Sequence, residues 1–193
     1  MSSSTKVVTT LLGLAFAAGV SAAPVTYEID PAHTYPSFEA DHSGGMSVWR
    51  GKFNSSAGKI TFDKAASAGT VEVTIDMKSI DFGHQGLNDH ANTPDIFDTA
   101  KYPTATYSGK LAGFANGAPT KVEGNLTMHG VTKPVTLTIN TFKCAPDSSG
   151  REKCGADAVT TLNREDFGVA FGKAFGFDMK VTLRIQVEAL AAS

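Results

Sequence analysis

The sequence has few of the features that mark most functional classes of protein. Its 193 residues include two cysteines and one tryptophan, and its formal net charge is only −2. It has no cluster of Lys or Arg, which argues against a nucleic-acid partner because binding to phosphates depends on concentrated positive charge. It has no GxSxG or HExxH motif, so neither a nucleophile-elbow hydrolase nor that type of zinc protease is indicated.

An apolar run, Val7–Val20, lies near the N-terminus. It follows Lys6 and precedes small residues, which is the pattern of a secretory signal peptide. We expect cleavage after Ala22, with cleavage after Ala23 as the alternative. A membrane anchor is the competing interpretation, but the run is short for a bilayer span and no charged stop follows it.

The remaining chain suits a single exported domain. The predicted organisation is a signal peptide at 1–22 and one exported domain at 23–193. About 170 residues fit one domain, and a chain of this size buries enough surface for a sizeable core. Loss of Lys6 takes the formal charge from −2 to −3.

The two cysteines, Cys144 and Cys154, predict a structural disulfide. An even number of cysteines in an exported protein is typical of disulfide bonding. The segment between them, APDSSGREK, is rich in turn residues and charges, as an exposed hairpin loop would be. Closing so short a loop stabilises the fold by about 2–3 kcal/mol on the chain-entropy model.

Strand signals follow one another along the domain. Apolar and polar residues alternate at 71–77, 135–140 and 181–187, and this period of two predicts strands with one apolar and one solvated face. Further strands are expected at Thr26–Ile29, Tyr35–Asp41, Val48–Phe53, Gly58–Phe62, Thr104–Phe114, Lys121–Met128 and Ala156–Leu162. Such strands joined by short turns favour an antiparallel sheet. Their length favours an elongated barrel, while the alternation alone leaves a sandwich open.

Helix is expected only in one polar excursion. Residues Gly86–Asn92 can form a short helix, and Thr93-Pro94 then resembles an N-cap followed by proline, opening a turn through Phe97. We expect Ile96 and Phe97 to plug one end of the barrel.

The same excursion contains a cluster of histidines and carboxylates. The residues are His84, Asp89, His90, Asp95 and Asp98. Such side chains can bind a transition metal, but without a tight ligand pattern we favour a solvated polar cap. No metal and no other cofactor is expected.

Three further histidines are candidates for a general base, namely His33, His42 and His129. His129 precedes Gly130, which suits a hairpin turn with positive φ, so we favour a turn role. For His33 we favour a partly buried, hydrogen-bonded role near the barrel mouth.

Phenylalanine is abundant, with twelve residues against one tryptophan. Four of them lie within Asp166–Asp178, interleaved with glycines that let a strand bend and leave room beside the rings. Ordinary core packing explains this pattern. The functional alternative is that some rings line an apolar tunnel.

Seven short motifs follow one another along the domain, namely Tyr27–His33, Trp49–Phe53, Ser79–Asp81, Pro94–Asp98, Lys101–Pro103, Gly124–Val135 and Asn163–Gly168. In this order they resemble the YceI family of periplasmic lipid-binding proteins, and we therefore expect a periplasmic location. The chain departs from the family at His84–Asn88, where many members carry charged residues.

This resemblance implies an eight-stranded antiparallel lipocalin-like barrel with a short helical excursion and a long apolar channel. It implies a non-enzymatic carrier of a polyisoprenoid or another long-chain amphiphile such as a fatty-acyl lipid. One alternative is an interaction module serving a membrane cytochrome b561-like partner. Another is a hydrolytic enzyme using His33 or the His84–Asp98 cluster. A transient membrane-surface contact and a homodimer stay open.

Alternation and aromatic content select the side chains that would line the channel and bind the lipid. They are Phe38, Phe53, Phe62, Val73, Ile75, Met77, Phe114, Leu126, Met128, Leu137, Phe171 and Phe175. The phase of each strand stays open, because a slip of one residue reverses a whole face.

Overall fold

The computed structural model describes residues 23–192, so the predicted signal peptide at 1–22 lies outside the described residues. The strands are β1 (Val25–Ile29), β2 (Tyr35–His42), β3 (Ser47–Phe53), β4 (Ser56–Asp63), β5 (Ala68–Asp76), β6 (Ile80–Asp81), β7 (Thr104–Ala112), β8 (Lys121–Met128), β9 (Val131–Pro146), β10 (Glu152–Asn163) and β11 (Lys180–Ala191). The helical elements are α1 (Gln85–Ala91) and the 3₁₀ helices η1 (Met77–Ser79), η2 (Arg164–Phe167) and η3 (Lys173–Phe175). No helix in this part of the chain is long and apolar enough to span a bilayer.

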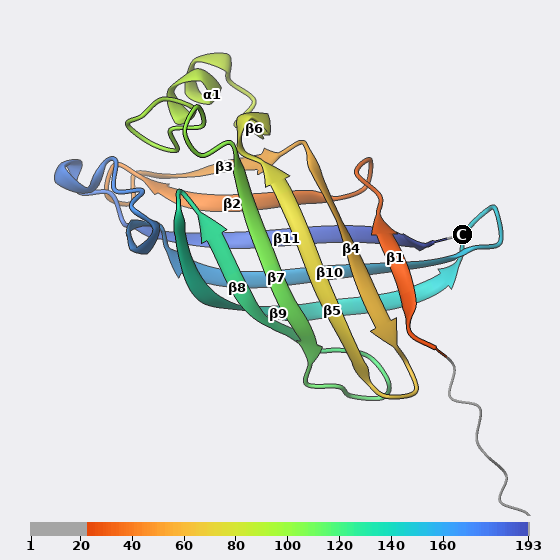
Figure 1. The fold of residues 1–193 in the computed structure, drawn as a ribbon. Helices are drawn as coiled ribbons and strands as arrows, with labels where there is room; N and C mark the ends of the chain where they lie inside the picture. Colours follow the sequence, from red (N-terminus) through yellow and green to blue (C-terminus); the bar gives the residue numbers. More distant parts are fainter. Residues whose placement is uncertain (1–22, 193) are drawn as a thin grey trace, which may run out of the picture.

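All of these strands belong to one antiparallel sheet that closes on itself (Figure 1). β11 pairs with β10 along one edge, and its other edge pairs with β2 at 181–186 and with β1 at 189–191. β1 and β2 therefore share one position in the barrel. β3 and β4 share the next position, and β5 and β6 the one after that. The result is the closed eight-stranded barrel predicted from the sequence, in place of a sandwich.

The break between β1 and β2 is set by the Asp30-Pro31 turn. The Asp30 carboxylate accepts a hydrogen bond from the Ala32 N–H at 3.0 Å and lies 2.7 Å from His33 Nδ1. Thr34, only 2% exposed, accepts a hydrogen bond from the Glu188 N–H on β11 at 3.2 Å. Proline has no backbone N–H to donate to a neighbouring strand, so strand pairing is interrupted at this turn. The hydrogen bond of Thr34 keeps the turn attached to β11.

The breaks after β3 and β5 are bonded to each other. The Ser55 N–H donates to Ser79 Oγ at 3.0 Å, and the Asn54 N–H donates to the Ser79 carbonyl at 3.0 Å. Asp76 caps η1 by accepting from the Lys78 N–H at 3.0 Å. The two strand positions thus bend together, and β6 leaves the barrel wall toward the excursion.

The excursion 82–103 covers the end of the barrel between β6 and β7 (Figure 1). Its helix α1 is short, and Asn88 attaches it to the barrel because its side-chain oxygen accepts from the Phe82 N–H at 2.8 Å. Ile96 and Phe97 face the barrel interior, where Phe97 packs on the cluster around Phe38 and Phe53. These positions agree with the predicted plug.

The glycine-rich segment Asp166–Asp178 is not a bent strand. It forms the end of η2, η3 and the turns around them. Gly168, Gly172 and Gly176 have φ of 78°, 89° and 81°, and this left-handed conformation is incompatible with a continuous strand. The glycine at 172 does leave room beside a ring, because a Cβ there would lie 2.6 Å from the Phe177 side chain.

Cys144 and Cys154 form a disulfide, as predicted. The pair lies within the β9–β10 ladder, where the two residues are directly opposite each other, rather than in the loop. The loop itself is confined to 147–151, where the Asp147 carboxylate accepts from the Ser149 and Arg151 N–H groups. The crosslink therefore joins β9 and β10, two of the longest strands, next to the loop that connects them.

Candidate apolar binding cavity

The barrel encloses a cavity of about 370 Å³ whose wall is mainly apolar. Every barrel position contributes to the wall, and so do the excursion and the segment after η2. On β5, Val73 and Ile75 face the cavity, whereas Glu72 and Thr74 are exposed to solvent. The alternation read from the sequence is therefore the physical cause of an apolar interior.

All the side chains predicted to line a channel, except Phe114 and Phe175, lie in this wall. Phe114 follows β7, which ends at Ala112 because Gly113 has a φ of 62°. Its ring instead packs over the end of the barrel, stacked on Phe62 with 6.1 Å between ring centroids. Phe175 is 73% exposed, since η3 carries it between two glycines of positive φ.

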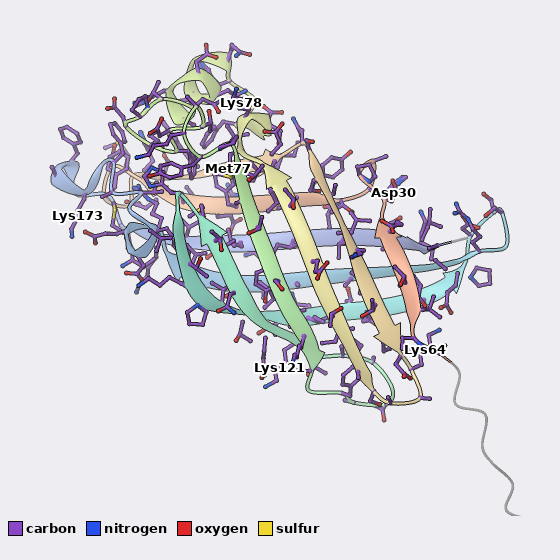
Figure 2. The ribbon with its side chains drawn as sticks, viewed as in Figure 1. Asp30, Lys64, Met77, Lys78, Lys121 and Lys173 are labelled. Atoms are coloured by element: carbon purple, nitrogen blue, oxygen red, sulfur yellow. A yellow bond between two sulfur atoms is a disulfide. The ribbon has the colours of Figure 1, made fainter. Side chains whose placement is uncertain are left out.

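Aromatic side chains close one end of the cavity, called here the closed end. Phe62 contacts Phe114 on one side and Phe142 on another, with 5.7 Å between the latter centroids. Tyr27 and Phe62 are only 1% and 3% exposed. Figure 2 labels Lys64 at this end of the barrel. These large rings pack closely over this end of the cavity.

Polar groups at the closed end are satisfied from outside the cavity. The Tyr27 hydroxyl donates to the Glu152 carboxylate, which also accepts from Lys64 Nζ at 2.5 Å. Burial, and then this hydrogen bond to Glu152, raise the pKa of Tyr27 above its ordinary value. The Tyr27 hydroxyl is thus held as a neutral donor to Glu152, and the apolar ring of Tyr27 lines the cavity.

Tyr107 in the wall is satisfied in the same manner. Its hydroxyl donates to the Val135 carbonyl at 2.9 Å and lies 3.2 Å from the Val122 carbonyl. Burial raises its pKa to about 12. A buried hydroxyl without such partners would be costly, so the bonded wall is suited to a hydrocarbon.

Half-buried aromatic and polar side chains line the other end, called here the mouth. His42 stacks on Trp49 with 3.9 Å between ring centroids, and Phe177 meets His42 edge-on at 5.3 Å. From the excursion, His90 meets Phe171 edge-on at 4.8 Å. All five side chains line the cavity. Excursion α1 and the β2–β3 turn lie at this end in Figure 1.

Arg164 is a residue of the mouth that the sequence analysis did not single out. It lines the cavity, and its two terminal nitrogens donate to the carbonyls of Val169 at 2.9 Å and Phe171 at 2.6 Å. Burial lowers the pKa of its guanidinium, while Asp41 and Glu165 act in the opposite direction. The sequence did offer one signal for Arg164: it is a cation at the start of a segment that is otherwise rich in phenylalanine and glycine.

The candidate catalytic histidines are dispersed. His33 lies on the outer surface with a side chain 58% exposed, rather than partly buried at the mouth as expected, because the Asp30-Pro31 turn projects it outward. His84 is the N-cap residue of α1 and is exposed. His90 alone of the excursion cluster lines the cavity, with Nε2 3.8 Å from the Asp95 carboxylate.

Two sets of three potential metal ligands occur among residues 23–192. One contains the disulfide cysteines, which have no thiolate to offer a metal. The other joins Asp30, His33 and Glu188, but Lys153 Nζ already lies 3.7 Å from Asp30 and 2.8 Å from Glu188. The predicted absence of a metal cofactor stays a prediction.

Residues 27–189 match the family model described as the YceI-like domain. The chain belongs to the YceI-like family. It is 31% identical to a UPF0312 protein of Vibrio cholerae over 93% of this chain and 96% of that protein. It is 35% identical to a UPF0312 protein of Pseudomonas aeruginosa over 82% and 83% of the two chains.

Solved structures share the YceI-like barrel. BcnA of Burkholderia cenocepacia is 26% identical with a TM-score of 0.68, covering 83% of this chain and 99% of that one. The YCEI protein of Campylobacter jejuni is 27% identical with a TM-score of 0.66, covering 77% and 88%. A domain of Saccharophagus degradans, described as polyisoprenoid-binding, is 16% identical with a TM-score of 0.62, covering 87% and 99%, and shows the fold alone.

Three of the YceI-like motifs meet beside the mouth. His129 and Gly130 form the β8–β9 turn with φ of 52° and 77°. The His129 ring lies 4.4 Å from the Tyr102 ring, and its Nδ1 lies 3.2 Å from the Phe167 carbonyl. His129 therefore lies in a turn, as predicted, and its side chain also connects the excursion to η2.

Proposed function

We propose that this protein is a periplasmic carrier of a polyisoprenoid or another long-chain amphiphile, held with its tail in the cavity and its head group at the mouth. The observation that carries the proposal is an apolar cavity with aromatic rings packed over one end and with His42, His90 and Arg164 among the aromatic side chains of the other. This asymmetry matches a molecule with an apolar tail and a polar head.

Burial of a tail is sufficient to drive such binding. Each CH₂ group removed from water contributes about 0.8 kcal/mol, so a tail of ~15 carbons contributes roughly 12 kcal/mol before ordering and association costs. The wall offers van der Waals contacts and no unsatisfied hydroxyl from Tyr27 or Tyr107. No catalytic group is needed.

The comparisons support the same ligand class. The Saccharophagus degradans domain described as polyisoprenoid-binding shares this barrel. Export to the periplasm rests on the predicted signal peptide at 1–22, and an oxidising compartment is also where a disulfide such as Cys144–Cys154 persists.

The two alternatives receive less support. A hydrolase would need a histidine and carboxylates converging on the cavity, whereas His33 lies on the outer surface and only His90 of the excursion cluster lines the wall. An interaction module for a membrane cytochrome would be favoured by a filled barrel with an exposed apolar patch, and this barrel is not filled. The cavity favours the carrier instead.

The test is to purify the exported protein from its own cell envelope and measure its native mass, then extract and identify the bound lipid. We expect a stoichiometric mass addition that disappears on extraction into organic solvent. Titration of the stripped protein with a fluorescent prenyl lipid and a fluorescent fatty acid then assigns the class. If neither binds and nothing is extracted, the carrier function is wrong.

A further inference from the structure

The protein exposes a small set of large apolar side chains beside the mouth. Among the described residues, those most exposed are Met46 at 81%, Phe175 at 73% and Val48 at 52%. Met46 and Val48 belong to the β2–β3 turn and the start of β3, and Phe175 belongs to η3. We call these three side chains the apolar tips. Exposed apolar side chains that gather in one place mark a contact surface.

The two segments that carry the tips are held together. The Asp41 carboxylate accepts hydrogen bonds from the Gly44 N–H at 3.0 Å and the Gly45 N–H at 2.6 Å in the turn. The same carboxylate accepts from the Asp178 N–H at 2.9 Å, just after η3. A Cβ on Gly44 would lie 3.2 Å from the Gly176 carbonyl oxygen. The tips therefore project from one joined rim.

This rim is continuous with the cavity. His42 and Trp49 flank the turn, and Phe171 and Phe177 flank η3, and all four line the cavity mouth. Figure 2 labels Lys173, the first residue of η3, at the same end of the barrel as Met77 at the foot of the excursion. The segments that carry the tips thus also carry aromatic side chains of the cavity mouth.

We propose that the apolar tips insert into the surface of a lipid bilayer and place the mouth against the membrane, where the amphiphilic cargo enters or leaves. This inference rests on the proposed carrier function, because a cargo with a long apolar tail resides in a bilayer rather than in water.

The charges around the tips support a bilayer held by apolar contact. Lys173 beside Phe175 is paired with Glu165, and Arg50 near Val48 lies 3.1 Å from Glu39. Each of these cations has a carboxylate beside it that offsets its charge, so we expect binding that does not require anionic lipid and changes little with salt.

A second copy of the chain fits the tips less well. Three side chains of this size offer on the order of 400 Å², whereas a stable protein interface buries at least about 1,200 Å² in total. Side chains on protruding turns suit shallow insertion into the boundary between head groups and acyl chains, to which apolar and aromatic residues bind.

The experiment uses vesicles of neutral phosphatidylcholine containing a fluorescent prenyl lipid. Vesicle association is measured by flotation, and transfer of the lipid to the protein is measured by stopped-flow fluorescence. Trp49, the single tryptophan in the sequence, reports insertion by quenching with brominated lipid. The test variant is Met46→Glu with Phe175→Glu, and the control is Thr74→Glu, which places a carboxylate on the solvent-exposed outer face of β5.

We expect the double variant to lose flotation and to take up the lipid from vesicles at least about tenfold more slowly. It should bind the same lipid normally when delivered from dilute ethanol, and Thr74→Glu should behave as wild type. Equal uptake rates, or a wild-type dimer that hides Phe175, would overturn docking. Failure of the wild type to bind lipid from ethanol would instead overturn the carrier function.

Discussion

At the scale of single residues, orientation within each strand decides what the side chain does. Ile75 and Thr74 are neighbours, yet Ile75 lines the cavity while Thr74 faces solvent. A polar substitution on the inner face meets hydrocarbon when a lipid is bound, whereas the same substitution on the outer face meets water. The pair is therefore a matched probe of the interior.

We predict that Ile75→Asp weakens lipid binding by about 1–3 kcal/mol, or roughly fivefold to 150-fold, because a carboxyl group is desolvated by the tail. Thr74→Asp is expected to bind as wild type. Fluorescent lipid titration measures both, and circular dichroism checks that both variants are folded. A folded Ile75→Asp protein with unchanged affinity would show that this strand does not contact the lipid.

Arg164 is predicted to be a clamp for the segment after η2. Arg164→Met removes two charge-assisted hydrogen bonds to the carbonyls of Val169 and Phe171, with an expected loss of about 2–3 kcal/mol in the free energy of unfolding. Arg164→Lys should recover only part of this, since an ammonium group cannot reproduce the planar fork.

The control for this change is Arg184→Met. Arg184 is an exposed arginine paired with Glu39 at 3.1 Å, and loss of a surface pair costs at most about 1 kcal/mol. Urea unfolding monitored by circular dichroism compares the three variants. Equal losses for Arg164→Met and Arg184→Met would contradict the clamp.

At the scale of the elements, the barrel depends on long strands that are reinforced where they end. β9 spans 16 residues and β10 spans 12. The Cys144–Cys154 disulfide joins them near the β9–β10 turn, while η2 and the β8–β9 turn are joined through His129 at the mouth. A disulfide thus stabilises one end of these strands, and the His129 contact stabilises the other.

We expect the Cys144→Ser, Cys154→Ser double variant to fold but to lose about 2–3 kcal/mol of stability, because the crosslink restricts the unfolded chain while the ladder hydrogen bonds remain. The bond itself is checked by intact mass after alkylation in denaturant. Two alkylated thiols in unreduced exported protein would show that the disulfide does not form in the cell.

At the scale of the whole molecule, a set of carboxylates stabilises loops and turns around the barrel. The Asp178 backbone N–H is the largest influence that lowers the pKa of Asp41, and the Gly83 N–H has that role for Asp81. Lys64, and then Tyr27, lower the pKa of Glu152. All three groups are more acidic in the folded protein than in an unfolded chain.

This direction predicts acid lability. A carboxyl group with a lowered pKa contributes its stability above the ordinary value of about 4, and the contribution is lost as the pH falls through the folded pKa. We expect the urea midpoint to be steady near neutral pH and to fall below about pH 4. Asp41→Asn should reduce that slope. A midpoint equal at pH 7 and pH 3 would show that these contacts do not stabilise the fold.

Local pattern by itself determined the strands, their apolar faces and most of the cavity wall. The period-two alternation at 71–77 is a property of consecutive residues, so it separates the apolar face of β5 from its polar face without knowledge of its neighbours. The cysteine pair and the ordered motifs were equally readable. The signal peptide remains a sequence-based prediction outside the described residues.

Only the tertiary structure decided which segments meet. Barrel closure decides that β1 and β2 share one edge of β11 and that His33 lies on the outer surface. Glycines of positive φ decide that Phe175 is exposed. No periodicity in the sequence specifies either effect. The mouth is formed by residues distant in sequence, His42, His90 and Arg164. Their placement results from long-range pairing, so it could not be derived from residues that are local in the chain.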